Sequence, residues 1–151
     1  MRRTILAALI VLALSGSSTL AVAQIPPPIT IEGLQADLVA KTGSDTVYFA
    51  GNSHGIDAAA QVTLSAQARW LLANAEVRVR LEGHADERTP RDYALAVGER
   101  RANAVRDYLV LQGVPAAQLT IISWGKERPA VEGTSEMALA LNRRVSTVLM
   151  R

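Results

Sequence analysis

Residues 76–81 alternate strictly between charged and apolar side chains, with Val77, Val79 and Leu81 separated by arginines. Because successive side chains of a strand point to opposite faces, this pattern predicts a β-strand with one buried face and one face in water. A sheet built from such strands buries its apolar face only when another layer covers it. The segment therefore restricts the chain to folds in which a second layer packs on one face of a sheet.

The rest of the chain supplies helices for that layer. Residues 58–74 are rich in Ala and Leu at helical spacing, and a second helix is predicted from Asp92, as its N-cap, to Gln112, with Gly113 as its stop. A shorter helix is predicted at residues 135–142, and further strands at residues 46–49, 119–124 and 145–150. This order predicts a two-layer α/β sandwich of the βαβαββ type, with a mixed sheet and helices on one face.

The N-terminus has the pattern of a secretory signal peptide. Two arginines precede an apolar run at residues 5–14, which is too short to span a membrane, and Ala21 to Ala23 form a small-x-small cleavage site. We therefore predict a signal peptide at residues 1–23. Residues 24–45 contain three consecutive prolines, and we expect an N-terminal arm or linker there, ahead of a single domain at residues 46–151.

The same region resembles a lipoprotein processing box that lacks its reactive residue. Leu14 to Ser17 has the shape of such a box, but Ser17 stands where the lipid-carrying cysteine is required, and the chain has no cysteine. Serine cannot form the thioether, so we expect a soluble periplasmic protein whose association with a membrane is at most indirect. The absence of cysteine also excludes disulfides, thiolate metal sites and cysteine nucleophiles.

Charge argues against a nucleic-acid partner. The chain has 16 Lys and Arg against 14 Asp and Glu, and removal of the signal peptide takes away two arginines, which leaves 14 against 14. A neutral domain without a basic run lacks the electrostatic footprint of nucleic-acid binding. His54 and His84 are the only histidines, too few to predict a metal site, and no spacing suggests a nucleophile or an acid–base pair. We therefore expect neither a cofactor nor enzymatic activity.

Two polar segments remain as candidates for a site. Residues 82–88 directly follow the predicted central strand, and residues 98–101 lie in the helix after it. Because this helix must run back along the sheet, it can bring Arg101 close to the C-terminal end of the strand, which Asp86 follows. Ligands of open α/β sheets bind at that end of the strands. A carboxylate beside a guanidinium fork is complementary to a zwitterion such as an amino acid. The alternative is a plain ion pair between loop and helix.

A third polar segment, Asn142-Arg143-Arg144, precedes the last predicted strand. It supports two interpretations, a second basic contact for a ligand or a helix end followed by arginines that face solvent. We favour the second interpretation, because charged side chains at element ends are most often solvated.

Taken together, these segments resemble the OmpA-like peptidoglycan-binding domain family, and within it the lipoprotein branch. The resemblance covers about residues 46–150. It rests on residues 47–49 (VYF), 82–88 (EGHADER), 98–105 (GERRANAV), 123–131 (SWGKERPAV) and 142–144 (NRR).

The resemblance implies a non-catalytic module that holds the meso-diaminopimelate stem peptide of peptidoglycan and helps to link the outer membrane to the wall. By correspondence of motifs, Asp86 and Arg101 clasp the zwitterionic end of the ligand, and Arg88, Val97 and Asn52 line the same pocket. The chain departs from the family pattern at Ala50, where an acid is usual, and at Ala94, where Asn is usual. These changes leave room for an alternative, a scaffold for periplasmic proteins of the Tol system with weakened peptidoglycan binding.

Overall fold

The structure, a computed structural model, describes residues 29–151. The predicted signal peptide at residues 1–23 and the three prolines lie outside the described residues. Four strands form one sheet in the order β1-β4-β2-β3, in which β2 and β3 are parallel and the other neighbours are antiparallel. The strands are β1 (Thr46–Tyr48), β2 (Arg78–His84), β3 (Leu119–Gly125) and β4 (Arg144–Met150).

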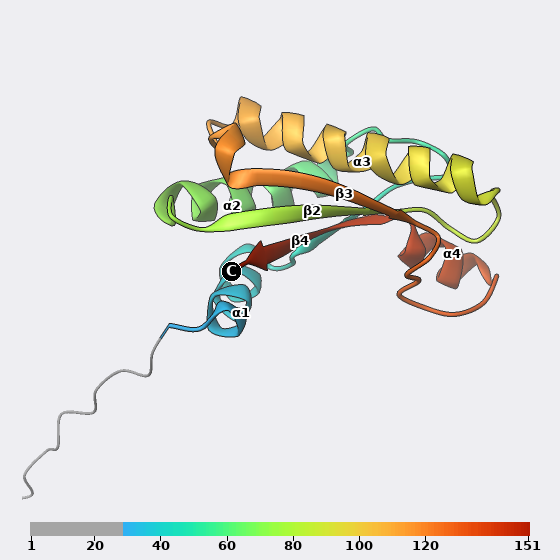
Figure 1. Cartoon of the computed structure of the whole chain (residues 1–151), viewed down its shortest axis with the longest axis horizontal. Helices are drawn as coiled ribbons and strands as arrows, with labels where there is room; N and C mark the ends of the chain where they lie inside the picture. Colours follow the sequence, from blue (N-terminus) through green and yellow to red (C-terminus); the bar gives the residue numbers. More distant parts are fainter. Residues whose placement is uncertain (1–28) are drawn as a thin grey trace, which may run out of the picture.

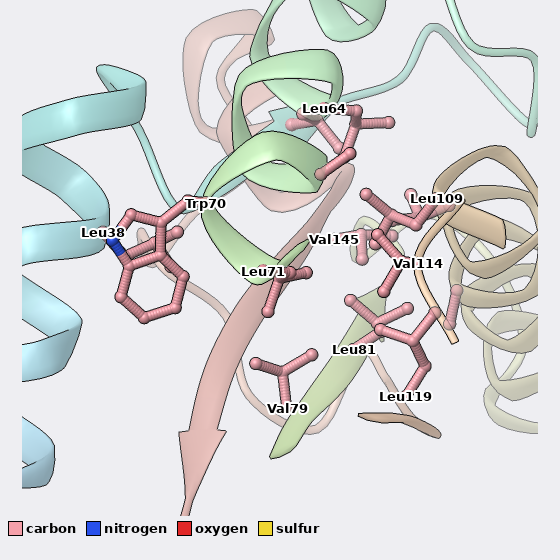
Figure 2. Packing of buried hydrophobic residues seen from close by; sticks show 14 of the residues in the cluster. Leu38, Leu64, Trp70, Leu71, Val79, Leu81, Leu109, Val114, Leu119 and Val145 are labelled. Atoms are coloured by element: carbon pink, nitrogen blue, oxygen red, sulfur yellow. The ribbon is translucent and has the colours of Figure 1, made fainter. Parts of the chain in front are cut away.

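Two long helices cover one face of this sheet (Figure 1). They are α2 (Ala58–Ala73) and α3 (Arg91–Leu111), while the shorter α4 (Glu136–Asn142) lies at the end of the sheet where β4 begins, and a 3-10 turn (Ala116–Gln118) precedes β3. The predicted α/β sandwich with a mixed sheet is confirmed. Figure 2 shows the core, in which Leu71 of α2 and Leu109 of α3 pack over Val79 and Leu81 of β2.

Two predicted boundaries differ from the structure. Helix α3 starts at Arg91 after Pro90, which makes no side-chain cap, so Asp92 lies inside the first turn and not at the N-cap. Proline fixes a backbone angle suited to helix entry, and the negative charge of Asp92 is favourable in a first turn. Strand β2 continues to His84, past the end of the alternating pattern at Leu81, because the pairing with β3 continues there.

The largest difference is helix α1 (Ile31–Thr42), which occupies most of the segment predicted to be an arm or linker at residues 24–45. Thr30 caps it by accepting a hydrogen bond from the backbone N–H of Gly33, and Gly43 ends it with a positive φ of 84°. Leu38 is fully buried against Trp70 of α2 (Figure 2). A helix of this length depends on such tertiary contacts, so helical propensity alone did not reveal it.

Helix α1 also protects an exposed edge of the sheet. Strand β1 is so short that, on the side away from β2, β4 has no strand partner beyond Ser146. The side-chain amide of Gln35 takes the place of a strand, because its Nε2 donates to the carbonyl oxygen of Thr147 and its Oε1 accepts from the N–H of Leu149, both at 3.0 Å. Helix α1 therefore covers backbone groups that would otherwise invite pairing with another chain.

We predict that Gln35→Ala lowers the free energy of unfolding by about 1–3 kcal/mol, because the substitution leaves two backbone groups of β4 without their partners. Urea unfolding followed by circular dichroism measures this change. Gln61→Ala is the matched control, since Gln61 is exposed and donates only one hydrogen bond, to the carbonyl oxygen of Ile56. Equal stability of the two variants would contradict the role of Gln35.

Among residues 29–151, no helix combines the length and the apolar content that a membrane span requires.

Candidate ligand-binding site

Two glycines bring α3 into direct backbone contact with the end of β2. A Cβ atom built on Gly83 would overlap the carbonyl oxygen of Gly98, and one built on Gly98 would collide with Oγ of Ser123. The hydroxyl of Ser123 in turn donates to the carbonyl oxygen of Leu95, at 2.7 Å. This close approach places the middle of α3 directly over the C-terminal end of β2, as the sequence predicted for Arg101.

The guanidinium of Arg101 lies completely buried at this point. Its Nη1 donates to the carbonyl oxygen of His84 (2.9 Å), its Nε to that of Ser53 (2.9 Å) and its Nη2 to that of Gly51 (2.6 Å). The side chain also lies over the ring of Phe49, 5.3 Å from the centroid. Burial and the nearby charge of Arg143 lower the pKa of Arg101 to about 10, so it remains charged at neutral pH. Arg101 thus ties the loop after β1 to the end of β2.

The carboxylate of Asp86 lies beside it and is held by two other arginines. Arg88 donates from its backbone N–H and its Nε to Oδ1 and from its Nη2 to Oδ2 (2.7 Å), while Nη1 of Arg143 donates to Oδ2 at 3.3 Å. Burial alone raises the pKa of Asp86, but these hydrogen bonds outweigh burial and lower the pKa below its ordinary value. Asp86 and Arg101 make no ion pair with each other, so the plain pair between loop and helix is not what the structure contains.

We call Asp86, Arg88, Arg101 and Arg143 the guanidinium cluster. Its charges sum to two positive units, three guanidinium groups against one carboxylate. Such a set can bind a carboxylate through planar N–H forks and can offer one carboxylate oxygen to an ammonium group. The cluster contains no nucleophile beside a base. Within residues 29–151, no three carboxylate or imidazole groups are placed to hold a metal ion.

The cluster lies inside the segment that a family model recognises. A model of the OmpA family matches residues 48–143. The chain belongs to the OmpA family. Among curated OmpA-type relatives, the peptidoglycan-associated lipoprotein of Rhizobium meliloti is 45% identical over 117 residues, which is 78% of this chain and 66% of that protein. The chain thus spans about two thirds of the length of this relative.

Other relatives agree with this assignment. The peptidoglycan-associated lipoprotein of Pseudomonas aeruginosa is 46% identical over 115 residues, which is 76% of this chain and 68% of that protein. The crystal structure of the peptidoglycan-associated lipoprotein from Burkholderia pseudomallei superposes with a TM-score of 0.70 at 36% identity, over 72% of this chain and 92% of that one. The predicted resemblance to the OmpA-like family and its lipoprotein branch is confirmed.

The remaining residues expected at an OmpA-type site lie around the guanidinium cluster. Asn52 is exposed in the loop whose Gly51 carbonyl oxygen accepts from Arg101. Val97 is buried and packs with Ala85 and Ala94 beneath the loop that carries Asp86. Asn52 therefore lies at the rim, and Val97 supports the cluster from below.

Helix α4 ends at Asn142 and β4 begins at Arg144, as the preferred interpretation of this motif expects, but the structure contradicts the expectation that its arginines face solvent. The side chain of Arg143 is only 13% exposed, and besides Asp86 it reaches the carbonyl oxygen of Phe49, to which its Nε donates at 2.9 Å. Asn142 is buried and binds the backbone of Ala130 and Val131. Strand β4 runs antiparallel to both β1 and β2, so its first residues meet the site where those two strands end. The signal for Arg143 in the sequence was the motif itself, which directly precedes the strand predicted at residues 145–150.

His84 is a buried histidine that holds no charge at neutral pH. Only 2% of its surface is exposed, and its Nδ1 has no hydrogen-bond partner. Burial, together with the smaller effect of the charges of Arg144 and Arg128, lowers its pKa to about 4. Between pH 6.5 and 4 the unfolded chain therefore binds a proton that the folded chain does not, so His84 makes the fold less stable as the pH falls through this window.

We predict that His84→Gln makes the free energy of unfolding less dependent on pH between pH 6.5 and 4. One such group changes the free energy of unfolding by at most about 1.4 kcal/mol per pH unit, and its destabilising effect is absent above pH 6.5. Denaturant titrations at pH 7, 5.5 and 4.5 measure the difference between the parent and the variant. His54→Gln is the control, because His54 is exposed. If the stability of His84→Gln fell with pH in parallel with that of the parent, His84 would not be the source of the pH dependence.

Proposed function

We propose that this OmpA-family chain binds peptidoglycan non-covalently, by holding the meso-diaminopimelate of the stem peptide at the guanidinium cluster, and that it catalyses no reaction. The observation that carries this proposal is the buried Asp86 carboxylate held by the guanidinium groups of Arg88 and Arg143, with the buried Arg101 guanidinium near it, in a chain whose relatives are named as peptidoglycan-associated. The free end of diaminopimelate is an ammonium beside a carboxylate, which is the complement of that set.

Each part of the ligand has a partner in the cluster. The ammonium takes the Asp86 carboxylate in place of Arg88, the partner whose side chain is the most exposed, at 49%. The carboxylate takes the guanidinium groups of Arg101 and Arg143. Arg101 uses only some of its N–H groups on backbone carbonyl oxygens, and two of those carbonyls, of Gly51 and Ser53, belong to an exposed loop that can adjust around a ligand. Asn52 in that loop adds an amide at the rim.

The departures from the family pattern fit this assignment. Ala94 is fully buried beneath the loop, where its methyl side chain packs with Val97 and cannot form a hydrogen bond. Ala50 is exposed next to Gly51, so the absence of an acid there removes one negative charge from the rim. A more positive rim favours the carboxylate of the ligand and weakens the hold on its ammonium.

A chain with this ligand and a cleaved signal peptide works in the periplasm, where it helps to hold the wall close to the outer membrane. The alternative is a scaffold for proteins of the Tol system, in which the cluster has lost its hold on peptidoglycan. The two proposals differ in whether the purified protein binds wall material when no other protein is present.

Co-sedimentation with purified peptidoglycan tests the proposal. We expect the parent protein to pellet with diaminopimelate-type peptidoglycan, free meso-diaminopimelate to release it, and Asp86→Asn to stay in the supernatant. Glu87→Gln is the matched control, because Glu87 is the exposed neighbour of Asp86. Lysine-type peptidoglycan, which lacks the second carboxylate, is expected to pellet much less protein. A parent that stays soluble in every case supports the scaffold and rejects the binding module.

A further inference from the structure

Strand β3 is the edge strand on the other side of the sheet, and helix α3 packs against its C-terminal end. Strand β3 pairs with β2 on one side and has no strand partner on the other within the described residues. Its seven residues, LTIISWG, include no charged residue and no proline, the devices that normally keep an exposed edge from pairing. The opposite edge of the sheet differs, since β1 is short and Gln35 of α1 covers β4.

A hollow of about 480 Å³ runs along this edge between β3 and α3, which lies alongside it (Figure 1). On β3 it is lined by Ile121, Ile122 and Ser123. Because consecutive side chains of a strand point to opposite faces, a hollow that touches all three runs along the backbone edge itself. On α3 the lining residues are Asp92, Leu95, Ala96 and Glu99.

The charged side chains that line the hollow are both acidic. Asp92 and Glu99 are exposed, while the nearby Arg91 pairs with Glu127 at 2.8 Å and Lys126 with Glu87 at 3.5 Å. The exposed Arg100 follows Glu99 in the helix but does not line the hollow. Asp92 and Glu99 are two helical turns apart, which is about 10 Å along α3. Alternate residues of an extended chain are about 7 Å apart, so two to three basic side chains on one face match this acidic row.

We propose that β3 receives an extended, basic segment of another protein as a fifth strand, with its alternate Lys or Arg side chains directed to Asp92 and Glu99. Backbone hydrogen bonds to the free edge supply affinity, and the acidic row selects basic segments. None of the residues that line the hollow belongs to the guanidinium cluster, so this surface is separate from the proposed peptidoglycan site. A second copy of this chain is a poor occupant, because two-fold pairing of β3 would bring two acidic rows together.

A synthetic peptide tests the proposal directly. The probe is a capped seven-residue peptide that alternates lysine with valine or threonine, and its partner probe carries glutamate in place of lysine. We expect the lysine peptide to shift the backbone amide signals of residues 119–125 in NMR spectra and to slow their hydrogen exchange. The double variant Asp92→Lys, Glu99→Lys is expected to weaken binding about tenfold, and Asp107→Lys, Glu132→Lys, which changes exposed acids elsewhere, to leave it unchanged.

Three results would overturn the proposal. Equal binding of the glutamate peptide would show that charge does not select the partner. Chemical shift changes confined to α3, without protection of the β3 amides, would show that the peptide does not add to β3 as a strand. A parent that forms dimers through β3 in sedimentation, with no peptide present, would make a second copy the occupant. The double variant is expected to pellet with peptidoglycan like the parent, so a failure here is distinguishable from a failure of the proposed function.

Discussion

Replacing Arg101 by lysine is expected to weaken peptidoglycan binding at least tenfold and to lower the free energy of unfolding by about 2–3 kcal/mol. A lysine keeps the charge, but its single ammonium group cannot reach three carbonyl oxygens that lie on different segments of the chain. The carbonyl of His84 would then be buried without its donor, and hydrogen bonds to charged groups are among the stronger ones in proteins. The loop of Gly51 and Ser53 would lose its tie to β2.

This prediction separates a role in binding from a role in folding. Urea unfolding gives the loss of stability, and co-sedimentation at a temperature where the variant remains folded gives the loss of binding. Arg100→Lys is the matched control, because Arg100 is the exposed neighbour in the same helix turn. A variant that loses stability but pellets like the parent would limit Arg101 to a structural role and move the carboxylate contact to Arg143.

Gly83→Ala is expected to be the most damaging of the single substitutions at the α3–β2 contact. The added Cβ meets the backbone carbonyl of Gly98, and a backbone cannot move aside as a flexible side chain can. Overpacking of a core commonly costs about 1–3 kcal/mol, and we expect a loss at or above the upper end of that range. Because the same contact positions Arg101, the variant should also bind peptidoglycan less well.

A second substitution makes this prediction specific. For Gly98→Ala the nearest atom is Oγ of Ser123, so removal of that hydroxyl in Gly98→Ala, Ser123→Ala should recover part of the stability. No side-chain deletion should rescue Gly83→Ala. Thermal unfolding of the three variants measures the difference, with Gly55→Ala as the control in which the added Cβ makes only ordinary contact. A rescue of Gly83→Ala by Ser123→Ala would show that the contact is not between backbones.

Local periodicity explains why most elements were predictable. Residues close in sequence carry both the alternation at Val77, Val79 and Leu81 and the helical spacing of α2 and α3. Each pattern is compatible with only one type of secondary structure when one face must be buried. Helix α1 was missed because its stability comes from Leu38 against Trp70 and from Gln35 on β4, partners that lie outside the helix. Its capping residues Thr30 and Gly43 were the available signals.

The site was predictable in part for the same reason. Asp86, Arg88 and Arg101 follow from one strand, its exit loop and the next helix, so a strand–loop–helix unit brings them together. The contact of Arg143 with Asp86 was not accessible from the sequence, because the two residues lie 57 positions apart and meet only through the antiparallel pairing of β4 with β2. The neighbours of Arg143 in the sequence favour a solvent-facing side chain, and they carry no information about β2.

The sequence by itself determined the α/β class, the order of strands and helices from residue 46 onward, and the strand end at which Asp86 and Arg101 lie, because these depend on side-chain period and on the direction of the chain. Only the tertiary structure decided that Asp86 binds Arg88 and Arg143 while Arg101 binds backbone carbonyl oxygens. Several guanidinium groups compete for one buried carboxylate, and the outcome depends on distances set by strand register and by the Gly83–Gly98 contact.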